Sequence, residues 1–246
     1  MKIIKICAIL FILSITQSFA NPVISGISSN EINIDTKFRG EQILLFGAKG
    51  DAGNVVIAVR GPKRNFAVTK KQKLLGIWYN GERVKFKDSN SFYALFSTFH
   101  GQDLDQNLLS DLEIGGDNIE FKNFGEMAKD KKNEFEAHLV EELEKQKLYS
   151  TNPKKIDFLD ETLFKVMLNF PKNIARGVYT VEIYLIQDDQ LLSFQSIPIY
   201  VNQVGISAKI LDFAHEESFL YAILAVLIAL VAGFIANYLF GRFFGK

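Results

Sequence analysis

The sequence predicts a mainly β protein: an immunoglobulin-like β-sandwich with a helical insertion, followed by one C-terminal transmembrane helix. Three observations support this fold class. About ten short apolar segments, separated by turn residues roughly every 8 to 12 positions, favour a sandwich over a barrel. Between two groups of these segments lies an acidic stretch with apolar residues at helical spacing. Near the C-terminus, residues 219–240 form 22 consecutive positions without a charged side chain.

Residues 1–20 are predicted to be a cleavable signal peptide. Two lysines precede the apolar stretch 6–13, and Ser18-Phe19-Ala20 supplies the small residues that signal peptidase reads before its cleavage site. Cleavage is expected before Asn21. Cys7, the only cysteine, lies in this segment, so the mature chain has no cysteine for disulfides, thiol catalysis or metal binding.

The exported domain, residues 21–210, begins with a succession of predicted short strands. Apolar residues alternate with polar ones or form short runs, and turn residues separate the segments. Asn80-Gly81 is the strongest hairpin signal, because a type I′ turn needs positive φ at both central positions. Val84 and Phe86 are expected to share one face of the strand that follows. The expected strands in this half are 31–35, 42–46, 54–59, 66–68, 74–79, 83–86 and 92–96.

A helical insertion is predicted at about 101–159, between the two halves of the sandwich. Residues 103–144 carry thirteen acidic side chains against four lysines, and Phe135, Leu139 and Leu143 recur at helical spacing. The pair Gly115-Gly116 is expected to separate two helices.

Strands are expected again at 162–170, 177–187 and 191–201, which complete the sandwich. In the first of these, apolar residues at every second position from Phe164 to Phe170 indicate one buried face. Gly177-Val178-Tyr179 is typical of the turn into a late strand of an immunoglobulin-type sandwich, where a tyrosine hydrogen-bonds to the backbone.

The charge-free segment 219–240 is predicted to span a membrane. As a helix it is roughly 33 Å long, enough to cross a hydrocarbon core of about 30 Å. Acidic residues in and beside the expected linker 211–218 precede it, whereas Arg242 and Lys246 follow it. Because basic residues favour the cytoplasmic side, we expect residues 241–246 in the cytoplasm and the sandwich outside, in the periplasm of a bacterial inner membrane.

Residues 60–87 form a strongly basic segment, with nine cations against the single acid Glu82. The segment is expected either to face the acidic insertion within the fold or to attract an anion, anionic lipid headgroups or an acidic partner. Trp78 and Tyr79, which lie among these charges, are expected to pack within a strand, and the alternative is that they stack on a ligand. The candidate contact residues are Arg60, Lys63, Arg64, Lys70, Lys71, Lys73, Arg83 and Lys85.

No pattern in the sequence predicts catalysis, a cofactor or a metal site. The chain has three histidines and lacks the HExxH, GxSxG, P-loop and dinucleotide-binding motifs. His100 with Asp103 is interpreted as a solvated loop, and His215 with the two glutamates after it as a juxtamembrane charge group. Without the signal peptide, 26 basic residues stand against 28 acidic ones, which argues against nucleic-acid binding. We therefore expect a non-enzymatic protein.

Small residues recur every four positions along the predicted span. Such a stripe allows another helix to approach closely, and an asparagine within it can hydrogen-bond across the contact. The expected partner is a membrane protein or a second copy of the chain. The candidate helix–helix contact residues are Ala225, Ala229, Gly233 and Asn237, with Gly241 continuing the stripe.

Several short motifs resemble the alphaproteobacterial putative transmembrane protein family, a functionally uncharacterised group. They are Leu44-Leu45-Phe46-Gly47-Ala48, residues 55–59 followed by Arg60-Gly61-Pro62, Gly76-Ile77-Trp78 and Ser91-Phe92-Tyr93-Ala94. The resemblance covers almost the whole chain, including the signal peptide and the single span. It implies this topology and a bacterial source, and it suggests a sulfite-exporter-like permease as a partner. It supplies no catalytic residues.

The sequence therefore favours a non-enzymatic, membrane-anchored periplasmic protein that supports or binds another envelope component, such as a permease. The alternative is a periplasmic binding module for an anion or small ligand on the basic hairpins. A concave pocket lined by Arg60, Arg64 and Lys85 favours the binding module, whereas a flat, exposed apolar patch favours the interaction protein. A buried cluster of histidine and carboxylate groups favours an enzyme.

Overall fold

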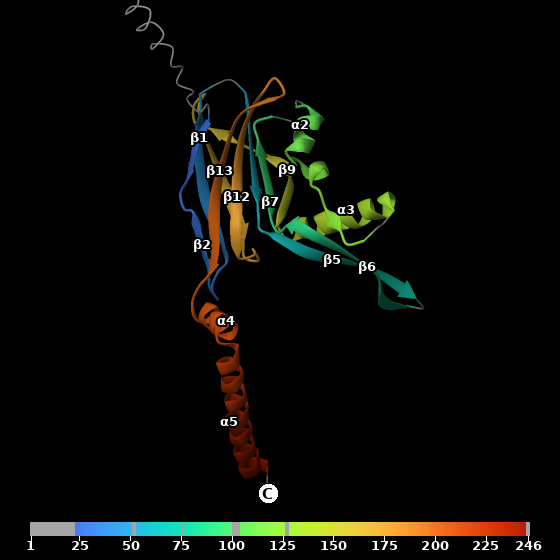
Figure 1. The fold of residues 1–246 in the computed structure, drawn as a ribbon, viewed down its shortest axis with the longest axis vertical. Coiled ribbons are helices and arrows are strands. Elements are labelled where there is room, and N and C mark those ends of the chain that lie inside the picture. Colours follow the sequence, from blue (N-terminus) through green and yellow to red (C-terminus); the bar gives the residue numbers. More distant parts are fainter. Residues whose placement is uncertain (1–22, 51–52, 75, 100–103, 126–127, 245–246) are drawn as a thin grey trace, which may run out of the picture.

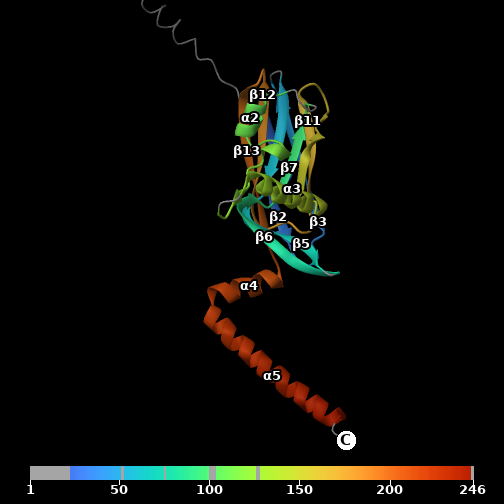
Figure 2. The ribbon, with the colours of Figure 1, turned by 90° about the vertical axis from the view of Figure 1, so that its right-hand side faces the viewer.

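The computed structural model describes residues 23–50, 53–74, 76–99, 104–125 and 128–244 (Figure 1). The predicted signal peptide with Cys7, and the pair His100 and Asp103, lie outside these residues. The described chain forms two packed sheets, two insertions beside them and a C-terminal helix that projects from one end (Figures 1 and 2).

The two sheets confirm the predicted immunoglobulin-like sandwich. In chain order, their strands correspond to A-B-E-D and G-F-C-C′ of that fold, with one strand added at each edge of the second sheet. The first sheet has the order β1 (Val23–Ile27), β3 (Gly40–Lys49), β11 (Leu163–Pro171), β10 (Asp157–Phe158). The second has the order β2 (Glu31–Ile34), β13 (Gln190–Gln203), β12 (Gly177–Gln187), β4 (Asn54–Arg60), β7 (Tyr93–Ser97), β9 (Tyr149–Lys155).

The predicted tyrosine corner is present at the start of β12. The Tyr179 hydroxyl donates a hydrogen bond to the Ala175 carbonyl oxygen at 2.9 Å. The side chain is fully buried and packs against the rings of Phe92 and Phe170. This bond ties the turn before β12 to the sandwich core, as in immunoglobulin domains.

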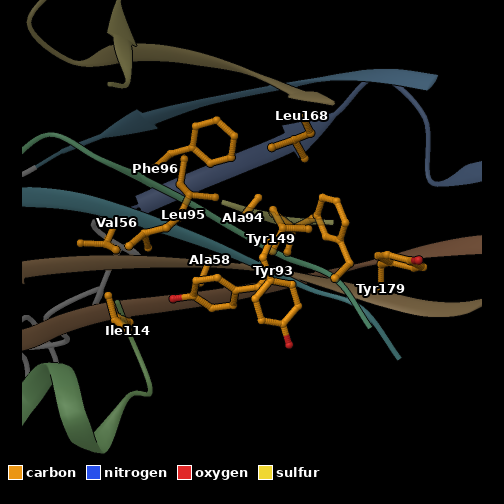
Figure 3. Packing of buried hydrophobic residues seen from close by; sticks show 14 of the residues in the cluster. Val56, Ala58, Tyr93, Ala94, Leu95, Phe96, Ile114, Tyr149, Leu168 and Tyr179 are labelled. Atoms are coloured by element: carbon orange, nitrogen blue, oxygen red, sulfur yellow. The ribbon is translucent and has the colours of Figure 1, made fainter. Parts of the chain in front are cut away.

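The core lies between the two sheets (Figure 3). Phe164 to Phe170 on β11 alternate between buried and exposed positions, as the sequence predicted. Residues 55–59 of β4 are all buried, on both faces of the strand. The insertion covers the outer face of the second sheet, and its Ile114 belongs to the same core cluster as Val56 and Ala58 (Figure 3).

Two insertions interrupt the sandwich. The hairpin of β5 (Lys63–Leu74) and β6 (Ile77–Asn90) joins β4 to β7. Between β7 and β9 lie α2 (Gln106–Asp111), the 3-10 turn η1 (Gly116–Asn118), β8 (Lys122–Asn123) and α3 (Lys129–Lys145). The helical part is shorter than the expected 101–159, since residues 149–155 form β9 and join the second sheet beside β7. The expected interruption near Gly115 is present, and this glycine has φ +99°.

The hairpin prediction at Asn80-Gly81 was wrong. The chain reverses between the paired residues Leu74 and Ile77, where Gly76 has φ +87°. Asn80 instead pairs with Lys71 inside the ladder, and the next pair is Thr69 with Arg83. Two residues of β6 therefore oppose one of β5, so that Gly81 contributes to a β-bulge rather than to a turn.

Two helices end the chain and lead away from the sandwich (Figures 1 and 2). Most of the expected linker 211–218 belongs to α4 (Ile206–Glu216). The next helix, α5 (Ser218–Phe244), contains the predicted span, and its segment Ser218–Phe240 is long and apolar enough to cross a membrane. No part of the most apolar stretch is buried in the fold. We call the end of the sandwich from which β13 passes into α4 the α4 end.

Candidate functional site

The outer face of the first sheet is an exposed apolar surface. Ile24, Phe46, Leu163 and Met167 are 67%, 51%, 47% and 44% exposed. The strand register makes these residues neighbours, because Ala48 pairs with both Ile24 and Leu163, and Leu44 pairs with Met167. The Phe46 ring lies over Gly26 of β1. We call Ile24, Leu44, Phe46, Ala48, Leu163 and Met167 the apolar outer face.

The insertion leaves this surface open. Its helices lie beside β7 and β9, away from β1 (Figure 1). A contiguous apolar surface on a soluble domain is typical of a protein or membrane contact. The sequence contained a signal for it, since β3 and β11 place apolar residues at outward as well as inward positions.

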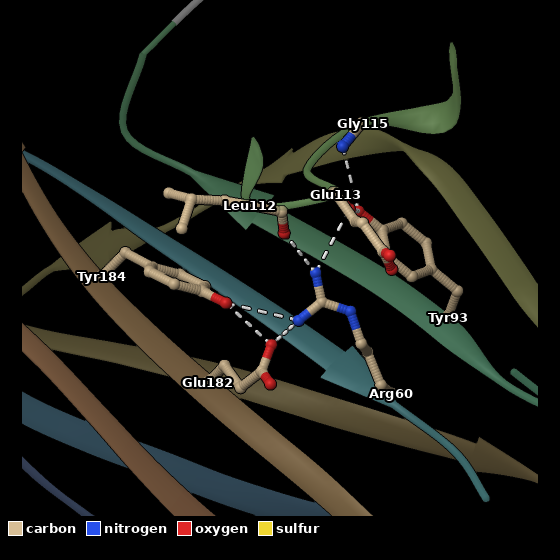
Figure 4. A network of polar contacts seen from close by, with 7 residues as sticks. All are labelled: Arg60, Tyr93, Leu112, Glu113, Gly115, Glu182 and Tyr184. Atoms are coloured by element: carbon tan, nitrogen blue, oxygen red, sulfur yellow. Dashed lines mark hydrogen bonds and ion pairs between the residues drawn. The ribbon is translucent and has the colours of Figure 1, made fainter. Parts of the chain in front are cut away.

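Arg60, predicted as an anion contact, is used within the fold (Figure 4). Its guanidinium forms an ion pair with Glu182 and donates hydrogen bonds to the carbonyl oxygens of Leu112 at 2.7 Å and Glu113 at 3.2 Å. It also donates to the Tyr184 hydroxyl at 3.3 Å. The side chain thus joins β12 to the loop after α2. We call Arg60 and Glu182, with these contacts, the Arg60 clamp.

Tyrosines complete the contact between insertion and sheet. The Gly115 amide donates to the Tyr93 hydroxyl at 3.0 Å, and the Tyr184 hydroxyl donates to the Glu182 carboxylate at 2.8 Å (Figure 4). Burial raises the pKa of both phenols above the ordinary value. These groups therefore stay neutral at physiological pH and act as hydrogen-bonding anchors, which is a structural role.

A cleft of about 780 Å³ lies between β5 and α3. β5 is an edge strand of the three-stranded sheet β5-β6-β8, and α3 lies beside it. Apolar side chains line the cleft and charged groups of both signs surround them. The apolar lining includes Phe66, Val68, Phe135, Leu139 and Leu143, and the charged lining includes Arg64, Lys70, Lys71, Lys145, Glu134, Glu141 and Glu142.

The basic segment is only partly neutralised by the acidic insertion. Lys70 forms an ion pair with Glu134 at 2.6 Å, which lowers the pKa of the glutamate, and Glu82 forms one with Lys131 at 2.6 Å. The three residues Arg60, Arg64 and Lys85 do not share a pocket: Arg64 lines the cleft, Arg60 belongs to the clamp and Lys85 is exposed on β6.

The expectation that Trp78 and Tyr79 pack within the fold was wrong. Both lie exposed near the end of the hairpin, together with Ile77. The Lys73 ammonium lies 5.7 Å from the centroid of the Trp78 ring. Lys71 lines the cleft, and Lys63 and Arg83 are exposed on the two strands of the hairpin.

His138, His215 and the small-residue stripe lie on helices. His138 on α3 lies 3.7 Å from Glu141, and the His215 ring contacts the Leu211 carbonyl oxygen at 2.8 Å. Within the described ranges, no three metal-ligating side chains come together. On α5, the small-residue stripe Ala225, Ala229, Gly233 and Asn237 is exposed. Because the helix has 3.6 residues per turn, each residue four positions further along lies slightly further round the helix. The stripe therefore winds gradually around α5, a pattern that suits a right-handed helix crossing.

A protein-family model described as "Putative transmembrane protein (Alph_Pro_TM)" matches residues 22–242. No curated protein and no solved structure matches the chain at significant similarity. The matched region includes both sheets, both insertions and the apolar part of α5.

Proposed function

The chain belongs to this alphaproteobacterial transmembrane protein family, and from this premise we propose that it is a non-enzymatic, membrane-anchored protein that binds and supports another envelope component, such as a permease. In this proposal α5 spans the inner membrane, and the sandwich lies in the periplasm. The orientation follows from the acidic residues before the span and from Arg242 and Lys246 after it.

The apolar outer face carries the proposal. Its side chains lie on three neighbouring strands of one sheet, and its large apolar side chains are exposed. Burying such a surface against a partner stabilises the complex by about 25 cal/mol for each Å² of apolar area removed from water. The same face has few charged groups, Lys165 being the one on β11 between Leu163 and Met167. Low charge and exposed large apolar side chains are the features of the centre of a protein interface.

The exposed stripe on α5 supports a contact within the membrane. Apart from its chain neighbours and the backbone of its own helix, no atom lies within 4 Å of the position that a β-carbon of Gly233 would occupy, so a second helix has room to approach it. A partner that spans the membrane can contact the stripe and the apolar outer face together. Two linked contacts bind more tightly than either alone because the second forms at high effective concentration.

The test uses a photo-crosslinking amino acid placed in the full-length chain in native membranes. We expect Phe46 and Met167 positions to yield the same discrete adduct, while a probe at Glu31, exposed on β2 of the other sheet, yields none. Phe46→Ser with Met167→Ser should abolish the complex at equal membrane abundance. Equal adducts from all three positions, or a complex that survives the double substitution, would contradict the proposal.

The span is tested separately by substitutions that change its bulk. Gly233→Leu and Ala229→Leu should lower the yield of the same adduct, because leucine separates the backbones, whereas Leu230→Ile should not. All three variants should remain anchored, since each keeps the helix apolar. Unchanged yields would restrict the contact to the sandwich.

A second candidate function is small-ligand binding in the cleft between β5 and α3. The observation that favours it is the apolar lining with Arg64, Lys70 and Lys71 at its edge, which suits an apolar ligand with an anionic group. Native mass spectrometry of the protein released from its own membranes should then show a bound small molecule. Ala67→Trp, at an exposed position in the cleft, should remove it, whereas Ala48→Trp on the apolar outer face should not.

A further inference from the structure

The end of the β5–β6 hairpin combines exposed apolar residues with lysines. Ile77, Trp78 and Tyr79 are 73%, 65% and 45% exposed. On the paired strand, Lys73 lies opposite Trp78 and Lys71 lies opposite Asn80. We call residues 70–74 and 76–83 the hairpin tip. Three consecutive large apolar side chains in water are unfavourable, and Trp and Tyr beside lysines are typical of the membrane–water interface.

The net charge of the hairpin tip is positive, and part of it is unpaired. Lys70 and Glu82, the only acid of the tip, are both paired with side chains of α3. Among the described residues, no acidic group lies within ion-pair distance of Lys71, Lys73 or Arg83. These cations remain available to an anionic surface, and basic residues close to a membrane are attracted by anionic headgroups.

The hairpin leaves the sandwich at the α4 end. Pro62, the residue before β5, packs on Gly177, since a β-carbon at Gly177 would lie 2.9 Å from Pro62 Cγ. Gly177 pairs with Val201 on β13, close to the start of α4. Leu211 of α4 lines a cleft together with Gly177 and Val201. The base of the hairpin and α4, the helix that precedes the membrane helix, are therefore close together.

The hairpin tip also reaches the height at which the membrane helix begins. In both Figure 1 and Figure 2, the free end of β5 and β6 lies about level with α4 and projects well to one side of it. Exposed Ile206 and Ile210 lie one turn apart on α4, as on a helix that rests on a membrane surface. Once α5 spans a bilayer, the hairpin tip therefore faces the surface of that bilayer.

We propose that the hairpin tip inserts Ile77, Trp78 and Tyr79 into the interface of the lipid bilayer that α5 spans, with Lys71, Lys73 and Arg83 at the anionic headgroups. The hairpin is then a second membrane contact that fixes how the sandwich stands on the membrane. A single helix leaves the domain free to tilt, whereas two separated contacts restrict it and present the apolar outer face in a constant direction. The proposal rests on the membrane anchor and not on the docking of a partner.

Trp78 is the only tryptophan of the chain, so its fluorescence reports on the hairpin tip alone. The full-length protein is placed in nanodiscs that contain phosphatidylglycerol, with and without brominated acyl chains near the headgroups. We expect the brominated lipids to quench Trp78 about twofold, because an indole at the interface contacts the upper acyl chains. Dissolved iodide should quench it little.

A matched control moves the tryptophan to the opposite end of the sandwich. Leu159 is exposed and its amide bonds to Leu163 at the start of β11, whereas Pro171 at the other end of β11 pairs with Gly40 near the α4 end. In the double variant Trp78→Phe with Leu159→Trp, brominated lipids should not quench the tryptophan at position 159, whereas iodide should quench it. Equal quenching at both positions would show non-specific contact, and an iodide-accessible Trp78 that the lipids do not quench would overturn the proposal.

Charge reversal separates lipid from protein contact. Lys71→Glu with Lys73→Glu should lose most of the lipid quenching in phosphatidylglycerol nanodiscs, and high salt should reduce the quenching of the unmodified chain. Lys63→Glu with Lys85→Glu makes the same charge change away from the tip and should leave the quenching unchanged. If both double variants behave alike, or if Trp78 is shielded only when a second membrane protein is added, the tip does not bind lipid.

Discussion

In the sandwich, every long strand has at least one face buried between the sheets, whereas the hairpin tip is exposed on both faces. Burial fixes strand register in the first region, because a shift by one residue would turn a whole apolar face into water. In the hairpin, a reversal at Gly76 and a bulge at Gly81 set the register instead. A segment that the core does not constrain is free to carry residues for a contact outside the fold.

The largest expected difference between the two regions is in stability. Ile183 on β12 is fully buried and Ile77 in the hairpin tip is exposed, so the same substitution probes both. Ile183→Ala should lower the free energy of unfolding by about 2–5 kcal/mol, and Ile77→Ala by less than about 0.5 kcal/mol. Urea unfolding of the detergent-solubilised chain, followed by far-ultraviolet circular dichroism, measures both. Similar losses would show that the hairpin tip folds onto the core in solution.

The Arg60 clamp joins the sandwich to the loop after α2 and should give the next largest effect. Arg60→Met removes the cation of a largely buried ion pair, so Glu182 keeps only the hydrogen bond from the Tyr184 hydroxyl and the carbonyl oxygens of Leu112 and Glu113 lose a charged donor. We expect a loss of about 2–3 kcal/mol, since hydrogen bonds to charged groups are the stronger ones. Amide hydrogen exchange should accelerate in residues 112–118 more than in β12. As a control, Arg39→Met at an exposed arginine should change neither the free energy of unfolding nor the rate of amide exchange. If Arg60→Met accelerates exchange equally in residues 112–118 and in β12, the clamp does not hold the loop after α2.

The tyrosine corner should give a smaller effect. Tyr179→Phe removes the hydrogen bond to the Ala175 carbonyl oxygen and should lower the free energy of unfolding by about 1 kcal/mol at neutral pH. Burial raises the pKa of Tyr179 from 10.0 to about 12. Below pH 10 the phenol is neutral in both the folded and the unfolded chain. As the pH rises from 10 towards 12, the phenol ionises in the unfolded chain before it does in the folded chain, so the free energy of unfolding falls. Unfolding measured between pH 8 and 12 should therefore show a shallower alkaline loss for Tyr179→Phe than for the unmodified chain. If the free energy of unfolding depends on pH in the same way in both proteins, Tyr179 does not cause the alkaline loss of stability.

The sandwich was predictable from sequence because its strands carry a periodic apolar pattern. Phe164 to Phe170 showed the inward face of β11, and Gly177-Val178-Tyr179 identified the corner. The turn at Gly76 was missed because Asn80-Gly81 is the stronger local signal, and only pairing along the whole hairpin places that dipeptide in a bulge. β9 was missed because Asn152 and Pro153 interrupt its pattern, although its first residue, Tyr149, is buried.

The candidate surfaces were less predictable, because they depend on what lies next to a residue in space. Arg60 looked like any other cation of the basic segment, and only the fold brings Glu182 and the loop after α2 against it. Trp78 and Tyr79 were interpreted as packing residues, since aromatic side chains in strands are commonly buried. The outward apolar positions of β3 and β11 were visible in the sequence, but their contiguity requires the register of three strands.

The smallest expected effect is the attachment of the hairpin to α3 through Lys70 and Glu134. Both side chains are substantially exposed, so their ion pair should couple weakly and be screened by salt. The pKa of Glu134 is lowered, chiefly by the hydrogen bond from Lys70, so the pair stabilises above the ordinary value of 4.5 and is lost as the pH falls below it. A double-mutant cycle with Lys70→Met and Glu134→Gln, measured at pH 7 in low and high salt and again at pH 3, should show coupling only in low salt at pH 7. Glu82 and Lys131 form a second exposed pair and serve as an independent comparison. Coupling that persists in high salt would mean that α3, rather than the membrane, holds the hairpin in place. The brominated lipids should then quench Trp78 equally well in nanodiscs without anionic lipid.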